Sequence, residues 1–200
     1  MREHIVLVFS PPFEGWESFD IGFRFILKFA VMKNIEEWFP VVDEEGNTTG
    51  KALRSVCHDG KSMLLHPVVH LHLFNTKGEL FLQKRVKTKD IQPGKWDTSV
   101  GGHVNPAETP DEALMREARE ELGINNFIPE FLKKYVWESS RERELVNSYL
   151  TISDEVPVIN TDEIEEGRFW TQNEIREKLG MNVFTPNFEN EFRMLFFDQG

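Results

Sequence analysis

The residues from 109 to 123 constrain the fold of this chain most strongly, because they carry the signals for both ends of one helix. Thr109 can cap the N-terminus, Pro110 suits the first helical position, and Glu112 completes a capping box. Gly123 suits the left-handed conformation in which many helices end. The sequence therefore predicts a helix of about four turns in this segment.

Two faces of this helix differ in chemistry when side chains are placed at about 100° per residue. The apolar face, which should pack on a sheet, consists of Leu114, Met115, Ala118 and Leu122. Glu117, Glu120 and Glu121 fall on an adjacent face because their spacing is i, i+3 and i+4. Carboxylates at this spacing repel one another, but a hard divalent cation such as Mg²⁺ or Mn²⁺ binds such oxygen ligands. Taken alone, the face also fits a solvated acidic surface, with Arg116 and Arg119 as counter-charges.

The helix lies within a longer pattern. This pattern reads Gly102, five residues, Glu108, seven residues, Arg116-Glu117-Ala118, one residue, Glu120-Glu121, one residue, Gly123-Ile124. It resembles the Nudix box, and every fixed position of that motif is filled. The resemblance implies a Nudix fold of the α+β class, with a mixed β-sheet sandwiched between α-helices (an α/β/α sandwich). It covers about residues 38–200, so we expect a Nudix hydrolase domain over residues 36–200.

The resemblance also implies a metal site. In the family, the glutamates that match Glu117, Glu120 and Glu121 bind a divalent metal, which we expect to be Mg²⁺ or Mn²⁺. The glycine that matches Gly102 supports this site through its backbone, and the arginine that matches Arg116 orients the glutamates together with the one that matches Glu108.

The implied activity is metal-dependent hydrolysis of a diphosphate linkage in a small molecule, a nucleoside diphosphate derivative or a related compound. The metal neutralises the diphosphate oxygens and lowers the pKa of a bound water, which then attacks phosphorus. The general base differs among family members, so Glu121 and Glu144 both remain candidates for this catalytic role.

A second resemblance, to the isopentenyl-diphosphate isomerase branch of the Nudix superfamily, covers about residues 58–104. The matching residues are Leu65-His66, Asn75-Thr76-Lys77-Gly78, Arg85, Lys89, Pro93-Gly94, Trp96 and Gly102-His103, with His58 fitting after a one-residue insertion. The isomerase metal ligands match His58, His66, His103 and a glutamate near residues 142–144, which implies a second metal site. The residues that match Arg85 and Lys89 hold the substrate diphosphate, and they lie in a basic stretch of an acidic chain.

Two departures from the isomerase favour a hydrolase. The isomerase carries a catalytic cysteine just before its Gly-His step, where this chain has Gly101, and its Nudix box is degraded, whereas this box is intact. Cys57 lies elsewhere in the sequence and is interpreted as a semi-buried structural thiol. Two alternatives remain open, an isopentenyl-diphosphate isomerase that uses a different acid and a non-catalytic module that binds a nucleotide or metabolite.

Composition narrows the partners and the compartment. The chain has 34 acidic and 23 basic residues and a formal net charge of -11, so we expect neither nucleic acid nor a membrane as partner. A single cysteine excludes a disulfide framework and indicates the cytoplasm. Residues 1–35 are either an arm packed on the domain or a segment preceding an alternative start at Met32. The resemblance leaves a homodimer open.

The remaining elements are predicted from apolar patterns and turn residues. Residues 68–74 and 79–84 should form a β-hairpin, residues 131–138 and 145–152 further strands, and residues 172–179 and 187–197 the last helices. His70 and His72 alternate with apolar residues and are interpreted as satisfied polar residues on one sheet face.

Overall fold

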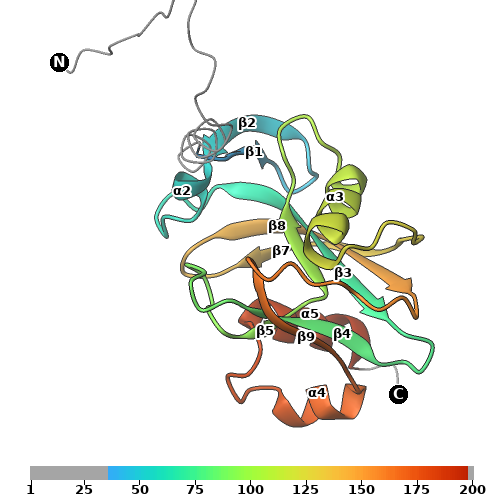
Figure 1. Cartoon of the computed structure of the whole chain (residues 1–200). Coiled ribbons are helices and arrows are strands. Elements are labelled where there is room, and N and C mark those ends of the chain that lie inside the picture. The colour runs from blue at the N-terminus through green and yellow to red at the C-terminus, as the bar shows by residue number, and fades with distance from the viewer. Residues whose placement is uncertain (1–35, 198–200) are drawn as a thin grey trace, which may run out of the picture. The chain divides into compact units, whose positions relative to one another are not determined.

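The computed structural model describes residues 36–197 (Figure 1). The elements are β1 (Trp38–Val42), β2 (Thr48–Leu53), α2 (Arg54–Cys57), β3 (Leu65–Phe74), β4 (Leu80–Arg85), β5 (Trp96–Asp97), β6 (Val100–His103), α3 (Pro110–Leu122), β7 (Glu130–Glu138), β8 (Arg143–Ile152), β9 (Ile164–Trp170), α4 (Gln172–Lys178) and α5 (Pro186–Phe196). The two interpretations of residues 1–35 lie outside the described residues. Within residues 36–197, no helix is long and apolar enough to cross a membrane.

A seven-stranded mixed sheet forms the centre of the described domain. Five of its strands follow the order β5-β4-β3-β8-β7. β3 pairs in parallel with β8 along its whole length, while β6 pairs antiparallel with β3 from Val68 to Leu71. β9 pairs antiparallel with β4, and β1 and β2 form a separate two-stranded sheet. The expected mixed sheet is therefore confirmed.

The hairpin expected from residues 68–74 and 79–84 is wrong in its extent. The chain does reverse between β3 and β4, but these strands share only the pair Phe74 and Leu80. Residues Val68 to Leu71 on that edge of β3 pair with β6, and β4 pairs instead with β9 and β5. The alternation of residues within a strand does not specify which distant strand becomes its neighbour.

Helices cover both faces of the sheet, which confirms the α/β/α sandwich. On one face, α3 packs on a cluster that includes Val69, Leu71, Leu73, Ala113, Leu114, Ala118 and Leu122. On the other, α4 and α5 pack on a cluster that includes Phe74, Leu80, Leu82, Ile175, Phe188 and Phe192. All ten residues of β3 are buried because its successive side chains enter these two layers in turn. Each fully buried Leu or Phe side chain stabilises the fold by about 1.5–3 kcal/mol.

The helix predicted between Thr109 and Gly123 is confirmed as α3. Thr109 and Glu112 form the reciprocal capping box, and Gly123 ends the helix with a φ of 67°. The apolar face differs in one position, because Ala113 is fully buried while Met115 is only partly buried. The last two helices begin and end within one residue of their predicted bounds.

Candidate functional site

Arg116 organises the acidic face of α3. Its Nε and Nη2 atoms donate to the Glu108 carboxylate at 2.8 and 2.9 Å, and its Nη1 atom donates to Glu117 at 2.6 Å and to Glu120 at 3.3 Å. Nη2 also donates to the backbone carbonyl of His103 at 2.9 Å. The planar guanidinium suits this role, because it presents five donors in a fixed fork. Hydrogen bonding to Arg116 holds the pKa of Glu108 below its usual range.

Glu121 lies deeper than the other carboxylates of this face. It is 6% exposed, and its Oε2 atom accepts hydrogen bonds from Gln83 Nε2 at 2.8 Å and from the Gly101 amide at 3.2 Å. Burial and, to a smaller extent, the nearby charge of Glu117 together raise the pKa of Glu121 to about 8. Burial also raises the pKa of Glu117 to about 6, although Arg116 opposes this shift. A divalent cation would stabilise both ionised carboxylates, so the electrostatics here fit a cation.

Gly102 provides a second feature that fits a metal site. A Cβ atom at Gly102 would overlap the Glu117 carboxylate, so only glycine lets the β6 backbone lie this close to that side chain. The neighbouring glycine is different, since a Cβ atom at Gly101 would lie 3.5 Å from Thr98 and 3.7 Å from His70, which is ordinary van der Waals contact. Carboxylates beside a bare backbone suit the oxygen preference of Mg²⁺ or Mn²⁺.

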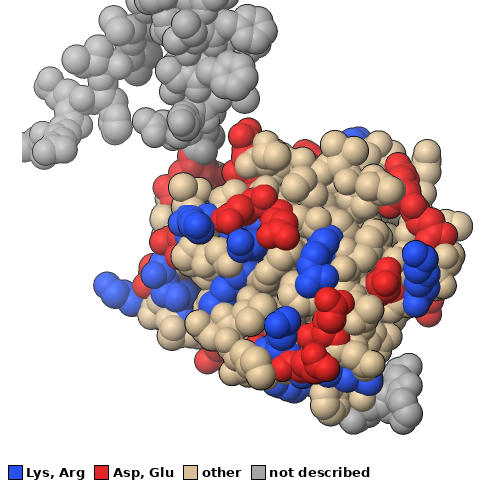
Figure 2. All heavy atoms as spheres, turned by 60° about the horizontal axis from the view of Figure 1, so that its bottom comes forward, with Lys and Arg blue, Asp and Glu red and all other residues tan. Residues whose placement is uncertain are grey.

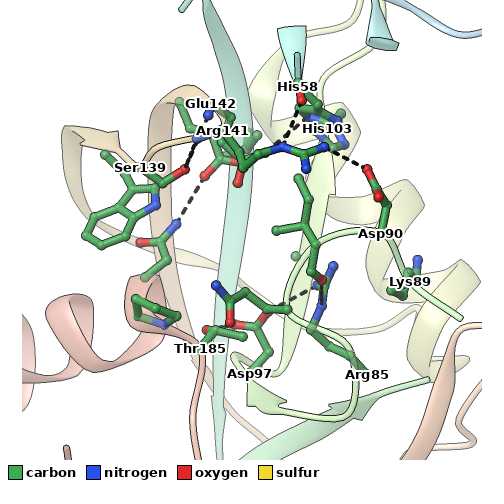
Figure 3. A pocket seen from close by; sticks show the side chains of 18 of the residues that line it. His58, Arg85, Lys89, Asp90, Asp97, His103, Ser139, Arg141, Glu142 and Thr185 are labelled. Atoms are coloured by element: carbon green, nitrogen blue, oxygen red, sulfur yellow. Dashed lines mark hydrogen bonds and ion pairs between the residues drawn. The ribbon is translucent and has the colours of Figure 1, made fainter. Parts of the chain in front are cut away.

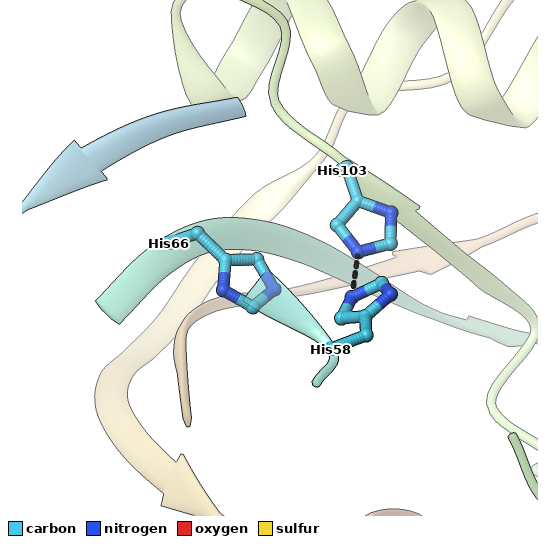
Figure 4. Close-up of side chains that lie close together, drawn as sticks. All are labelled: His58, His66 and His103. Atoms are coloured by element: carbon cyan, nitrogen blue, oxygen red, sulfur yellow. Dashed lines mark hydrogen bonds between the residues drawn. The ribbon is translucent and has the colours of Figure 1, made fainter. Parts of the chain in front are cut away.

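Three histidines from separate segments meet near the end of β6 (Figure 4). The potential ligand atoms of His58, His66 and His103 all lie within 4.8 Å of one another. His103 Nε2 is 3.2 Å from His58 Nε2, and Glu142 Oε2 is 3.4 Å from the same His58 atom. The structure therefore brings together the histidines expected at the second metal site, with a glutamate from the expected region beside them.

The surroundings of the three rings favour their neutral form. Burial lowers the pKa of His58 to about 4, and burial also lowers the pKa values of His66 and His103. His66 Nδ1 lies 3.0 Å from the carbonyl of Leu64, while His66 Nε2 is buried without a hydrogen-bond partner in the described part of the chain. Phe39 stacks on His103 with ring centroids 4.1 Å apart. Neutral imidazoles with an unused nitrogen fit a metal-binding set.

A pocket with a volume of about 200 Å³ opens beside the histidines (Figure 3). Four basic residues line it, namely Arg54, Arg85, Lys89 and Arg141. Each has an acidic partner: Arg54 with Glu37 at 2.8 Å, Arg85 with Asp97 at 3.2 Å, Lys89 with Glu163 at 2.9 Å and Arg141 with Asp90 at 3.1 Å. The two residues expected to hold a diphosphate, Arg85 and Lys89, thus lie at one pocket.

One face of the molecule mixes both signs of charge. Figure 2 shows Lys and Arg side chains interspersed with Asp and Glu side chains rather than separated from them. A chain with a net charge of -11 can attract an anionic ligand only through such local groups or through bound cations.

Glu144, the second candidate base, lies on β8 and lines the pocket. Asn187, at the start of α5, donates to Glu144 Oε2 at 3.1 Å. Burial and, to a smaller extent, the charge of Glu142 together raise the pKa of Glu144 to about 8. For Glu121, in contrast, the largest charge contribution comes from Glu117. The two candidates therefore occupy different surroundings, one at the acidic helix and one in the pocket.

Sequence patterns alone do not identify Glu191 on α5, which lies against the expected polar face of β3. Its Oε2 atom is 2.7 Å from His70 Nδ1, and its Oε1 atom is 3.4 Å from His72 Nε2. His70 is therefore a satisfied polar residue as expected, and it also lines the pocket. The sequence does carry one signal for this pair, an acidic residue within one helical turn of Phe188 and Phe192. A carboxylate on an apolar helix face needs a buried partner.

Cys57 is more deeply buried than the expected semi-buried thiol. Its exposure is 0%, and it packs in a cluster with Phe39 and Ala52. Burial raises the pKa of the thiol, which disfavours the nucleophilic thiolate. A structural role for Cys57 agrees with these surroundings.

Two features define the class of this protein. The first is the mixed sheet between helices, and the second is the acidic helix α3 with Arg116 on it and Gly102 against it. The chain belongs to the NUDIX family. The NUDIX domain model matches residues 64–189. More particularly, the chain belongs to the branch that resembles isopentenyl-diphosphate isomerase. It is 31% identical over 160 residues to isopentenyl-diphosphate Delta-isomerase 1 of Photorhabdus laumondii, covering 76% of this chain and 90% of that protein.

Two further similarities agree with this placement. An uncharacterized Nudix hydrolase of Listeria monocytogenes is 32% identical over 162 residues, covering 77% of this chain and 90% of that protein. The crystal structure of a Deinococcus radiodurans protein superposes with a TM-score of 0.70 at 25% identity, covering 80% of this chain and 99% of the other.

Proposed function

We propose that this protein is a metal-dependent diphosphatase that hydrolyses a diphosphate linkage in a small molecule. One observation carries the proposal: the Arg116 guanidinium bridges Glu108, Glu117 and Glu120 beside a glycine whose Cβ would displace Glu117. A solvated acidic face would require neither the close approach of Gly102 nor the burial of a further carboxylate behind it.

Each residue then has a distinct role. Glu117, Glu120 and Glu121 would hold Mg²⁺ or Mn²⁺, which when bound neutralises diphosphate oxygens and makes a water more acidic. Arg116 keeps the carboxylates oriented. Arg85 and Lys89 would exchange their present carboxylate partners, Asp97 and Glu163, for the substrate diphosphate. Water adds to phosphorus, the bridging P–O bond breaks, and the proton of the water passes to a glutamate.

Glu121 and Glu144 both suit the role of this base, because burial raises the pKa of each to about 8. Glu121 is itself one of the three proposed metal ligands, so acting as the base would be a second role for it, whereas Glu144 lies outside that set. The pH profiles of Glu121→Gln and Glu144→Gln distinguish the two, because loss of the true base removes the ascending limb of kcat while loss of the other leaves that limb in place.

Isomerisation of isopentenyl diphosphate is the second candidate. The cluster of His58, His66 and His103 and the relative from Photorhabdus laumondii favour it. Isomerisation needs acids and bases that move a proton onto and off carbon, and Gly101 supplies no such group at the position of the isomerase cysteine. Incubation with isopentenyl diphosphate is therefore expected to yield no dimethylallyl diphosphate.

A substrate panel tests the proposed function. Nucleoside diphosphate sugars, dinucleoside polyphosphates, nucleoside triphosphates and prenyl diphosphates are incubated with Mg²⁺ and assayed for phosphate products. Glu120→Gln should abolish turnover without unfolding the chain, because the Glu120 side chain is 54% exposed. Glu177→Gln, an exposed carboxylate on α4, is the matched control and should remain active. Metal-dependent binding without any product would favour a non-catalytic module, and full activity of Glu120→Gln would contradict the assignment of the metal site.

A further inference from the structure

A buried ion pair lies beside the pocket on the α5 side of the sheet. His70 is 7% exposed and Glu191 is fully buried, with 2.7 Å between His70 Nδ1 and Glu191 Oε2. Burial is the largest single influence and lowers the pKa of His70, but the charge and hydrogen bond of Glu191, together with the charges of Glu144 and Asp97, outweigh burial and raise the pKa to about 9. His70 is therefore a fixed cation at neutral pH, held on a central strand.

The other edge of the His70 ring faces Gly101. A Cβ atom at Gly101 would lie 3.7 Å from His70 Cδ2 and 3.9 Å from His70 Nε2. Because Nδ1 is engaged with Glu191, Nε2 is the remaining donor of the imidazolium. Glycine places no side chain against this edge of the ring, and both residues line the pocket.

The neighbouring lining is polar as well. Glu144 and Asp97 both act electrostatically on His70, and Thr185 donates to Asp97 at 2.8 Å. A hydrocarbon group placed here would remove the remaining hydration of a buried cation without offering it a hydrogen bond. An oxyanion would instead accept a charge-assisted hydrogen bond from Nε2.

We propose that His70, held by Glu191, is a specificity residue that recognises a carboxylate on the organic part of the substrate. The inference rests on the proposed hydrolase function, in which the diphosphate itself lies at the acidic helix and at Arg85 and Lys89. A carboxylate fits better than a phosphate monoester, because Asp97 lines the same pocket and repels a doubly charged group more strongly than a singly charged one.

Two small diphosphates of nearly the same shape test this proposal. 2-Carboxyethyl diphosphate ends in a carboxylate, and 3-methylbutyl diphosphate ends in an isopropyl group at the same place. Dissociation constants are measured by calorimetry with Ca²⁺ to slow turnover, and phosphate release is measured with Mg²⁺. The wild-type protein should prefer the carboxylate compound by about 10- to 100-fold, the range that a hydrogen bond to a charged group provides.

His70→Gln should bring this preference close to unity. His72→Gln is the matched control, because His72 lies on the same strand and face, is 0% exposed and contacts the same glutamate, but is not among the residues that line the pocket. It should keep the wild-type preference. His70→Arg retains a positive charge and should keep part of the preference, and thermal unfolding of all three variants checks that they are folded.

The outcomes separate this inference from the proposed hydrolase function. A His70-dependent preference in binding without phosphate release would contradict the hydrolase and retain the subsite. Equal phosphate release from both compounds, or an unchanged preference in His70→Gln, would retain the hydrolase and overturn the subsite. In ¹⁵N NMR of histidine-labelled protein, the His70 Nε2 resonance should shift with the carboxylate compound alone, and the absence of that shift would also overturn the subsite.

Discussion

Replacement of Gly102 by alanine tests the acidic site without removing any of its charged groups. The added methyl group would overlap the Glu117 carboxylate, and its three nearest atoms all belong to that side chain, so Glu117 has to move. In moving, Glu117 loses the hydrogen bond from Arg116 at 2.6 Å and its place beside Glu121. Gly102→Ala therefore displaces a proposed metal ligand while every carboxylate remains present.

The expected magnitude follows from these contacts. A hydrogen bond to a charged group contributes about 1.5–3 kcal/mol, and loss of one group that stabilises the transition state lowers kcat by about 100- to 1,000-fold. We therefore expect kcat to fall by about 100- to 1,000-fold, with weaker Mg²⁺ binding. The overpacking itself should lower the free energy of unfolding by about 1–3 kcal/mol, which leaves the protein folded.

Two glycines provide controls for the same chemical change. A Cβ atom at Gly50 on β2 would have no neighbour within 4 Å among the described residues, so Gly50→Ala should leave kcat and stability unchanged. Gly101→Ala adds a methyl group at ordinary contact distances and should leave the melting temperature unchanged. Turnover is followed by phosphate release and Mg²⁺ binding by calorimetry. Wild-type kcat and Mg²⁺ affinity in Gly102→Ala would refute the proposed position of the metal.

Three further predictions concern stability and the histidine cluster. The pKa of Glu121 is raised from 4.5 to about 8 in the folded state, so its stabilising contribution is fully present below about pH 4.5 and is lost as the pH rises toward about 8. Urea unfolding of the metal-free protein should show this decline, and Glu121→Gln should show a flatter profile. His58→Ala should weaken Mn²⁺ binding at the cluster in calorimetry by at least about 10- to 100-fold, the loss typical when only an outer partner of a metal ligand is removed, and an unchanged affinity would exclude His58 as a ligand. Phe188→Ala, at a site with 0% exposure between the sheet and α5, should lower the free energy of unfolding by about 3–5 kcal/mol in denaturant titrations.

The parts of the fold that follow from the sequence are those fixed by neighbouring residues. Thr109, Glu112 and Gly123 specify the ends of α3 through contacts within one helical turn, so the predicted helix is confirmed there. The pairing of β3 depends instead on β6 and β8, which come later in the chain. The apolar alternation of a strand is compatible with several neighbouring strands. For this reason the predicted hairpin has more paired residues than the observed one.

The same distinction applies to the site. The acidic face of α3 follows from helical spacing, and the three histidines follow from the resemblance to the isomerase branch. The pair of His70 and Glu191 follows from neither, because 121 residues separate its members and the docking of α5 brings them together. Burial makes this pair chemically informative, and burial is a property of tertiary packing that residue spacing does not give.

The adjacent residues Gly101 and Gly102 lie between the acidic site and the pocket. Successive residues of a strand point to opposite faces, and here one glycine faces His70 while the other lies against Glu117. Adjacent residues of β6 therefore contact the acidic site and the pocket, and both glycines line the pocket. A cysteine at position 101, as in the isomerase, would stand in the pocket and cover the edge of His70. It would leave the packing of Glu117 unchanged. The choice between these side chains would thus alter the ligand groups that the pocket can accept, while the proposed diphosphate chemistry depends on the glycine that follows.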